Sequence, residues 1–249
     1  MIRRPPRSTP SNSSAASDVY KRQQVCSESI MQSKEQTRLV YENLARFYSI
    51  FRSRNGFAKI RRLLSLEDGM SLLDCGTGPG KYAYGLANAH PGVVVFGLDL
   101  CENFLRIVRR KAEAKGVDNL LLFGGDAECL PFGDETFDRI LCVQVLLLLQ
   151  DKESAVSEMY RVLKKGGLLL VVETRRRFLP WRELYYAFVL PVAMKLASLR
   201  EPSMAKAKRE DYGGRNFYHE ELNALLGSVP FASVDIDVKA TQMYAVCRK

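Results

Sequence analysis

Short apolar runs alternate with helical patterns from residue 70 onward. Strands that are buried on both faces read as near-continuous apolar stretches. Five such runs, rich in Leu, Val and Ile, predict strands at residues 71–75, 93–99, 120–123, 137–143 and 167–173. Apolar positions at helical spacing predict three helices, at 81–90, 102–115 and 152–163, with Asp151 as the N-cap of the third. Strands that alternate with helices are typical of a parallel sheet with helices on both faces.

The two ends of the chain follow different patterns. Residues 233–239 alternate apolar and polar positions, and a second run at 242–249 follows after two residues, which predicts an antiparallel hairpin. A loop leading into a short helix is expected at 216–222, and residues 36–66 are expected to form an N-terminal helical lid that includes a helix at 37–51. The predicted fold is an α/β, Rossmann-like three-layer sandwich with a seven-stranded, mostly parallel sheet, this hairpin and a helical cap.

The first 23 residues are treated apart from the predicted domain at 24–249. They are rich in Ser, Pro and Arg, have almost no apolar periodicity, and resemble translated sequencing-adapter read-through. A disordered basic tail is the alternative, since so polar a stretch buries little. Neither interpretation makes it a signal peptide, because it lacks a continuous apolar core. It carries five Lys or Arg and one Asp, so the formal charge of +9 falls to +5 without it.

The remaining positive charge is concentrated in one segment. Residues 175–211 hold nine Lys or Arg against four Asp or Glu, and the rest of 24–249 sums to zero. Nucleic-acid binding would need a basic stripe interleaved with aromatic residues, so no nucleic-acid partner is expected. The six cysteines form no C-x-x-C pair and only two histidines are present. We therefore expect no metal site, reduced thiols and a cytoplasmic location.

A glycine-rich turn stands between the first strand and the first helix of the alternating region. The stretch is SLLDCGTGPGKYAYGLA, residues 71–87. Its strand ends in an acid, Asp74, and glycines follow at positions 76, 78 and 80. Such a turn presents successive backbone N–H groups at a helix N-terminus, where anions and polar ligand groups bind. Glycine also removes the Cβ atoms that would block a close approach. By itself the pattern is weak, because many Rossmann-like proteins share it.

Acidic residues also follow the next two strands. Asp99 ends the second strand, 19 residues after Gly80, where a carboxylate can accept both hydroxyls of a ribose. Asp126 and Ala127 follow the third strand, at the edge where an adenine amino group could be read. Three acids at three successive strand ends predict a nucleoside ligand across the switch point of the sheet. The alternatives are Asp99 as a helix cap and Asp126 as an ordinary loop acid.

Four motifs occur in order along the chain. They read SLLDCGTGPG, VVVFGLDL, GDAECLPFGDETFD and YRVLKKGGLLLVVE. From about residue 36 to the C-terminus, their order and spacing resemble class I S-adenosylmethionine-dependent methyltransferases. The most similar group includes quinone C-methyltransferases and phospholipid N-methyltransferases. One departure is Ser49, where relatives often have Asp after the Tyr, so the resemblance assigns that position no role.

The resemblance implies S-adenosylmethionine as the cofactor and assigns the glycine turn to its methionine part. In that reading the turn residues Gly76, Thr77, Gly78 and Gly80 wrap the methionine, with Asp74 near its ammonium group.

The resemblance also assigns the adenosine part of the cofactor. Asp99 would bind the ribose hydroxyls, and Leu100 would pack on the adenine. Asp126 and the Ala127 backbone would read the edge of the base, and Gln144 would leave the fourth strand beside the reactive centre. Each of these roles follows from the family's motifs and not from the spacing alone.

Two other functions compete with a methyltransferase. Tyr160 and Lys164 form Y-x-x-x-K, the catalytic pair of short-chain dehydrogenases, which would make the protein an NAD(P)-dependent Rossmann oxidoreductase. Their helix is expected to end at once in residues 165–167, so we interpret the pair as part of a solvated helix face with Tyr160 partly buried. The other alternative is a non-catalytic module that only binds S-adenosylmethionine.

The insert at 175–215 is expected to form a cap that shapes the acceptor site. Its apolar core has 11 residues and contains Pro191, too short and broken to span a bilayer of about 30 Å. Aromatic residues beside arginines in 175–200 predict either an interfacial helix in peripheral contact with a membrane or a cap packed on its own domain. Under both interpretations the lining is apolar and aromatic, which favours a small, hydrophobic or lipid-like acceptor, methylated by in-line displacement.

A dedicated acid or base is not required for such a reaction, because the methyl group is already activated. If one is needed, His219 is the candidate, since a loop histidine can titrate near neutrality. A surface histidine that begins a helix is the alternative. The sequence leaves the oligomeric state open.

Overall fold

The computed structural model describes residues 56–175 and 217–249. Its elements in chain order are α3 (Phe57–Leu64), β1 (Ser71–Cys75), α4 (Lys81–Ala89), β2 (Val94–Asp99), α5 (Glu102–Glu113), β3 (Leu120–Gly124), β4 (Phe137–Val143), the 3-10 turn η1 (Leu146–Leu148), α6 (Lys152–Val162), β5 (Leu163–Thr174), α9 (His219–Gly227), β6 (Ser233–Val238) and β7 (Gln242–Arg248). The helix predicted at 37–51 and nearly all of the cap predicted at 175–215 lie outside the described residues.

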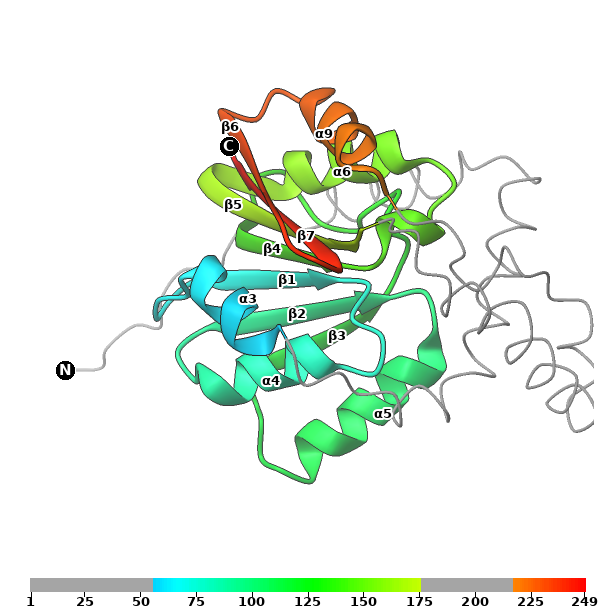
Figure 1. Cartoon of the computed structure of the whole chain (residues 1–249). Helices are drawn as coiled ribbons and strands as arrows, with labels where there is room; N and C mark the ends of the chain where they lie inside the picture. Colours follow the sequence, from blue (N-terminus) through cyan, green and yellow to red (C-terminus); the bar gives the residue numbers. More distant parts are fainter. Residues whose placement is uncertain (1–55, 176–216) are drawn as a thin grey trace, which may run out of the picture.

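Seven strands form one sheet in the order β3-β2-β1-β4-β5-β7-β6 (Figure 1). The strands β1 to β5 pair in parallel, and β7 runs antiparallel to both β5 and β6. The predicted seven-stranded, mostly parallel sheet with a C-terminal hairpin is therefore confirmed. In this register Asp74 pairs with Gly97 and Asp99 pairs with Gly124. The ends of these strands gather at one edge of the sheet, called here the carboxyl edge.

Helices cover both faces of the sheet, which gives the three predicted layers. Figure 1 shows α3, α4 and α5 on one face and α6 and α9 on the other. The helix α3 lies inside the range predicted as a lid, and it packs on the sheet: Ile60 and Leu64, one turn apart, are buried in a cluster with Leu170 and Val172 of β5. Burial of this apolar stripe positions α3, because apolar contact drives helices onto sheets.

The helix α6 begins and ends close to its predicted bounds. The side chain of Asp151 accepts a hydrogen bond from the backbone N–H of Ser154 at 2.9 Å, which confirms the predicted N-cap. The strand β5 begins at Leu163, four residues before the predicted start. Leu163 already pairs with Phe137, and the register shifts before pairing resumes at Leu168. Gly166, with a φ of 74°, lies within the irregular stretch.

The connection from β3 to β4, residues 125–136, contains no helix. It must cross β2 and β1, because β3 lies at the edge of the sheet. Phe132 in this segment packs edge-on against Phe137 at 4.9 Å and against Phe123 at 5.4 Å between ring centroids. Aromatic packing therefore covers a part of the sheet that a crossover helix usually covers.

Candidate functional site

The glycine turn between β1 and α4 adopts backbone angles that favour glycine. The φ angles of Gly76, Gly78 and Gly80 are 75°, 50° and 75°. A Cβ atom at Gly76 would overlap the Val145 side chain, whereas one at Gly78 would meet none of the described residues within 4 Å. The turn is thus closed by protein at Gly76 and open at Gly78, where a ligand can approach the backbone.

Asp74 fastens the turn to the first turn of α4. One of its carboxylate oxygens accepts hydrogen bonds from the Thr77 hydroxyl at 2.8 Å and from the Ala83 N–H at 2.9 Å. The side chains of Asp74 and Thr77 are both buried. Burial raises the pKa of Asp74 to about 7, although the two hydrogen bonds act in the opposite direction. Asp74 therefore holds the turn, and its contact with a cofactor ammonium stays a prediction.

Asp99 connects the glycine turn to the start of α5. One oxygen accepts from the Gly78 N–H at 2.7 Å, and the other accepts from the Cys101 N–H at 2.8 Å. Burial raises the pKa of this carboxyl above its usual value, while these bonds lower it. The helix-cap alternative is thus partly realised, because Cys101 is the N-cap residue of α5. The same carboxylate has further lone pairs that can accept ligand hydroxyls.

The three predicted acids lie around one buried thiol. Cys75, the last residue of β1, is fully buried, and burial raises its pKa strongly. The charges of Asp74, Asp99 and Asp126 each raise the pKa of this thiol further. Strand pairing places them together: Leu98, which precedes Asp99, pairs with Cys75, and the Asp99 carbonyl accepts from the N–H of Gly125, the residue before Asp126, at 3.1 Å. The three acids therefore share one region of the carboxyl edge.

The residues assigned to the adenine lie next to this region. Leu100 follows Asp99 and exposes 38 % of its surface, so an apolar side chain faces solvent beside this carboxylate. Asp126 begins a tight turn: its side chain accepts from the Glu128 N–H at 2.9 Å, and its carbonyl accepts from the Cys129 N–H at 3.2 Å. Ala127 is buried within that turn.

Gln144 follows β4 with a φ of 58°, which is rare for a residue that is not glycine. Its backbone N–H donates to the Val172 carbonyl at 2.8 Å, and its side-chain amide donates to the Thr174 hydroxyl at 2.8 Å. The next residue, Val145, is the one that closes on Gly76. Gln144 is exposed at the carboxyl edge, so its side chain is available to a ligand.

Glu173 was missed in the sequence, although it repeats the pattern of an acid at the end of a buried strand. Its side chain is fully buried, and one oxygen accepts from the Leu146 N–H at 3.0 Å. The other oxygen has no hydrogen-bond partner within the described residues. Burial raises the pKa of Glu173 to about 8. The signal that could have identified it is an acid directly after the apolar run in GGLLLVVE.

His219 is exposed and begins α9. Two residues earlier, Phe217 forms a β-bridge with Arg175, which follows β5. His219 therefore lies near the carboxyl edge, and its role as a base stays a prediction.

The dehydrogenase pair is not assembled. Lys164 belongs to β5 and forms an ion pair with Asp138 at 2.8 Å. The same Asp138 oxygen accepts from the Ser71 hydroxyl at 2.8 Å, so this cluster lies at the starts of β1, β4 and β5, opposite the carboxyl edge. Tyr160 packs its ring against Phe231. Asp138 thus has a structural role at this end of the sheet, and the oxidoreductase alternative has no support in this geometry.

The described part of the chain shows no cluster of His, Cys, Asp or Glu that could hold a metal ion. Within the same residues, no helix has the length and apolar character needed to cross a membrane. Of the cysteines in the described ranges, Cys75, Cys101, Cys142 and Cys247 are buried.

Comparisons with known proteins agree with this geometry. Residues 73–171 match the methyltransferase domain family. The demethylmenaquinone methyltransferase of Geobacillus stearothermophilus is 32% identical over 223 residues, covering 84% of this chain and 93% of that protein. A SAM-dependent methyltransferase structure from Aquifex aeolicus has a TM-score of 0.55 at 18% identity and covers 76% of this chain and 87% of its own.

A third comparison concerns the fold. Haemonchus contortus phosphoethanolamine N-methyltransferase 2, solved in complex with S-adenosyl-L-methionine, has a TM-score of 0.58 at 15% identity, covering 77% of this chain and 51% of that one. Together with the family match and the relative at 32% identity, these findings identify the chain: it belongs to the class I S-adenosylmethionine-dependent methyltransferases and is an enzyme that uses this cofactor.

Proposed function

We propose that this enzyme methylates a small hydrophobic acceptor of the quinone type. The observation that carries the acceptor class is the extent of the match to demethylmenaquinone methyltransferases. The alignment covers 93% of the Geobacillus stearothermophilus protein at 32% identity. The apolar and aromatic composition of residues 175–200 supports the same acceptor class.

The described residues fit S-adenosylmethionine at the carboxyl edge. The backbone at Gly78 is open to a ligand, and Asp99 already bonds the Gly78 N–H at 2.7 Å. We assign the methionine part to the glycine turn and the ribose hydroxyls to Asp99. The exposed Leu100 side chain is an apolar surface that an adenine ring would cover. Asp126 and Ala127 complete the proposed adenine contacts.

The chain's own residues bind and orient the reactants. When bound, S-adenosylmethionine supplies a methyl group already activated by a positive sulfur, which an acceptor takes in line with the breaking bond. Val145 closes the turn at Gly76, and Gln144, held to Thr174, borders the reactive centre in our assignment. Correct alignment supplies much of the rate of such a transfer. If the acceptor must lose a proton, we assign the removal of that proton to His219, acting as the base.

We also propose a peripheral membrane contact through residues 175–200. Basic residues near an anionic leaflet each contribute on the order of 1 kcal/mol of binding. A quinone with an isoprenoid tail resides in the membrane, so such a contact would bring the acceptor to the site. Sedimentation with anionic vesicles tests this, and the absence of binding would leave the alternative of a cap packed on its own domain.

A methyl-transfer assay tests the acceptor class. The purified enzyme is incubated with methyl-labelled S-adenosylmethionine and one of three acceptors: a demethylated naphthoquinone reduced to its quinol, phosphatidylethanolamine vesicles, or a mixture of polar metabolites. We expect label in the quinone only. Label in the phospholipid or in the polar fraction would overturn the acceptor class.

A binding experiment tests the cofactor assignment separately. Asp99→Ala removes the proposed ribose contact, and we expect calorimetry to show at least about tenfold weaker binding of S-adenosylmethionine. Asp118→Ala, which removes an exposed carboxylate, is the control. An unchanged affinity in Asp99→Ala would remove the ribose assignment.

A further inference from the structure

The crossover from β3 to β4 has an unusual need for hydrogen-bond partners. It runs through residues 125–136 without a helix, so its backbone groups lack the partners that a helix supplies. Ala127 and Leu130 in this segment are nevertheless buried. The partners must come from elsewhere, and two side chains of α6 supply three of them, for the Leu130 N–H and for the Leu130 and Phe132 carbonyls.

Arg161 uses all five guanidinium N–H groups in this region. Its Nε and one Nη2 hydrogen donate to the two carboxylate oxygens of Glu158, both at 2.7 Å. Nη1 donates to the Phe132 carbonyl at 2.9 Å and to the Asp134 carboxylate at 2.7 Å. The remaining Nη2 hydrogen donates to the Leu130 carbonyl at 3.2 Å. A guanidinium has five N–H donors, so every donor is satisfied.

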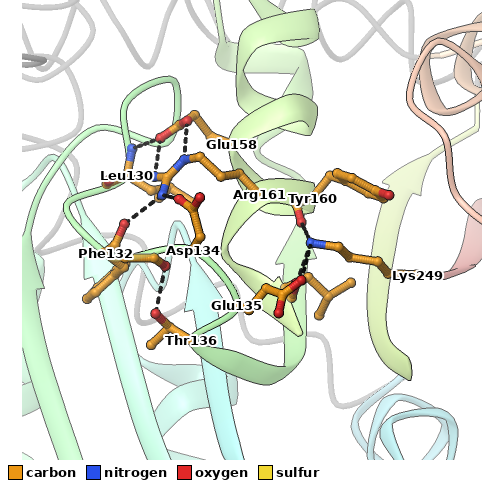
Figure 2. Close-up of polar contacts among 11 residues, drawn as sticks. Leu130, Phe132, Asp134, Glu135, Thr136, Glu158, Tyr160, Arg161 and Lys249 are labelled. Atoms are coloured by element: carbon orange, nitrogen blue, oxygen red, sulfur yellow. Dashed lines mark hydrogen bonds and ion pairs between the residues drawn. The ribbon is translucent and has the colours of Figure 1, made fainter. Parts of the chain in front are cut away.

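Leu130 is held at both of its backbone groups. Its N–H donates to Glu158 at 2.9 Å, and its carbonyl accepts from Arg161. Figure 2 shows Arg161 and Glu158 turned together toward the segment with Leu130, Phe132 and Asp134, while Lys249 lies on the other side of the helix. Both side chains of the pair are only 19 % exposed, so the pair is shielded from much of the solvent.

Leu130 lies next to the residues of the proposed adenine contacts. The turn from Asp126 to Cys129 is closed by its own hydrogen bonds, and Leu130 follows it directly. Glu128 in the same turn accepts from the N–H groups of Gln150 and Asp151 at the start of α6, at 2.8 and 3.2 Å. The turn is therefore connected to both ends of α6 and has little freedom to shift on its own.

We infer that Arg161 and Glu158 are positioning residues for cofactor recognition: they replace the missing crossover helix and set the place of Asp126 and Ala127 against the adenine. The inference rests on the proposed adenine contacts of those two residues. If the inference is right, substitution of Arg161 or Glu158 changes which base the site prefers. Substitution of a purely structural pair would change only the stability of the fold.

The test compares two products that differ only in the base. S-adenosylhomocysteine carries an amino group that Asp126 can accept from, whereas S-inosylhomocysteine carries a carbonyl oxygen at that place. The preference of the wild type for adenine, measured by calorimetry, should be at least about tenfold, because a mismatch leaves a polar group of the site unpaired. In Arg161→Gln we expect this preference to fall to about threefold or less. The KM for S-adenosylmethionine should rise while kcat changes less than about twofold.

Two further variants complete the test. Glu158→Gln keeps an acceptor for Leu130 and weakens the pair, so we expect an intermediate loss of preference; it serves also if Arg161→Gln does not fold. Lys249→Met is the matched control, because the Lys249 ammonium donates to the Tyr160 and Leu163 carbonyls at the end of α6. Its contact with the crossover is an ion pair with Glu135 at 3.9 Å, away from Leu130 and the turn at Asp126. We expect it to lower stability and to keep the base preference.

The outcomes separate the inference from the proposed function. An unchanged base preference in both pair variants, with a stability loss like that of Lys249→Met, would overturn the inference and leave methyl transfer to the quinone untouched. A wild type without any preference for adenine would overturn the assignment of Asp126 and the inference with it. Failure of the quinone assay alone would concern only the acceptor, since the base preference is measured without one.

Discussion

Glu173→Gln tests whether a buried carboxyl in this fold is neutral at physiological pH. Burial raises the pKa of Glu173 from 4.5 to about 8 in the folded protein. Between these values the folded protein holds a proton that the unfolded chain releases. The stabilising contribution is therefore complete below pH 4.5, decreases as pH rises, and is lost above pH 8.

The size of the effect follows from the width of this window. Each pH unit within it lowers the free energy of unfolding by about 1 kcal/mol, which amounts to at most about 3 kcal/mol by pH 7. Glutamine keeps an oxygen for the Leu146 N–H but brings an amide N–H₂ to the place of the second Glu173 oxygen, which has no partner among the described residues, at a cost of about 1–3 kcal/mol. The variant should be the less stable protein at pH 5 and the more stable one at pH 8.

Urea unfolding at pH 5, 6, 7 and 8, followed by circular dichroism, measures the free energies of unfolding of wild type and variant and shows whether their order reverses. Glu153→Gln, which changes an exposed glutamate on α6, is the control and should shift the curves equally at all four pH values. If the difference between wild type and Glu173→Gln does not change with pH, the carboxyl is ionised and paired in the folded protein, and the reasoning is refuted.

Three further substitutions probe the site and its alternatives. Gly76→Ala forces a side chain into a φ of 75° and onto Val145, so thermal unfolding should show a loss of about 2 kcal/mol or more and calorimetry a loss of cofactor binding; wild-type affinity would contradict it. Asp74→Ala leaves the Thr77 hydroxyl without its acceptor, and denaturant unfolding should report about 1–3 kcal/mol of destabilisation. Tyr160→Phe should keep the rate of methyl transfer, and a large loss of rate would reopen a catalytic role for that residue.

The layout of the sheet and the cofactor edge could be predicted from the sequence because each depends on local patterns. Buried parallel strands are apolar throughout, and the glycines of the turn have positive φ angles that other residues rarely adopt. The early start of β5 was missed, because Lys164, Lys165 and Gly166 interrupt the apolar run although Leu163 already pairs with Phe137. The cofactor roles of the individual residues remain predictions.

The contacts that hold the site together could not be predicted in the same way. Arg161 lies about thirty residues from Leu130 and Phe132 in the sequence, and their hydrogen bonds depend on how the crossover lies on α6. Nothing in the local pattern distinguishes this arginine from one on a solvated helix face. Glu173 was missed for a similar reason, since its burial depends on the register of β5 against β4 and β7.

The strand β7 follows every other strand in the chain, yet it lies between β5 and β6. During synthesis on the ribosome, the edges of β5 and β6 that pair with β7 therefore stay unpaired until β7 has emerged. Such edges are prone to pair with other chains. Nascent chains halted before residue 242 should need chaperones more than the released protein does, and a premature stop there would yield an aggregating product instead of a shortened enzyme.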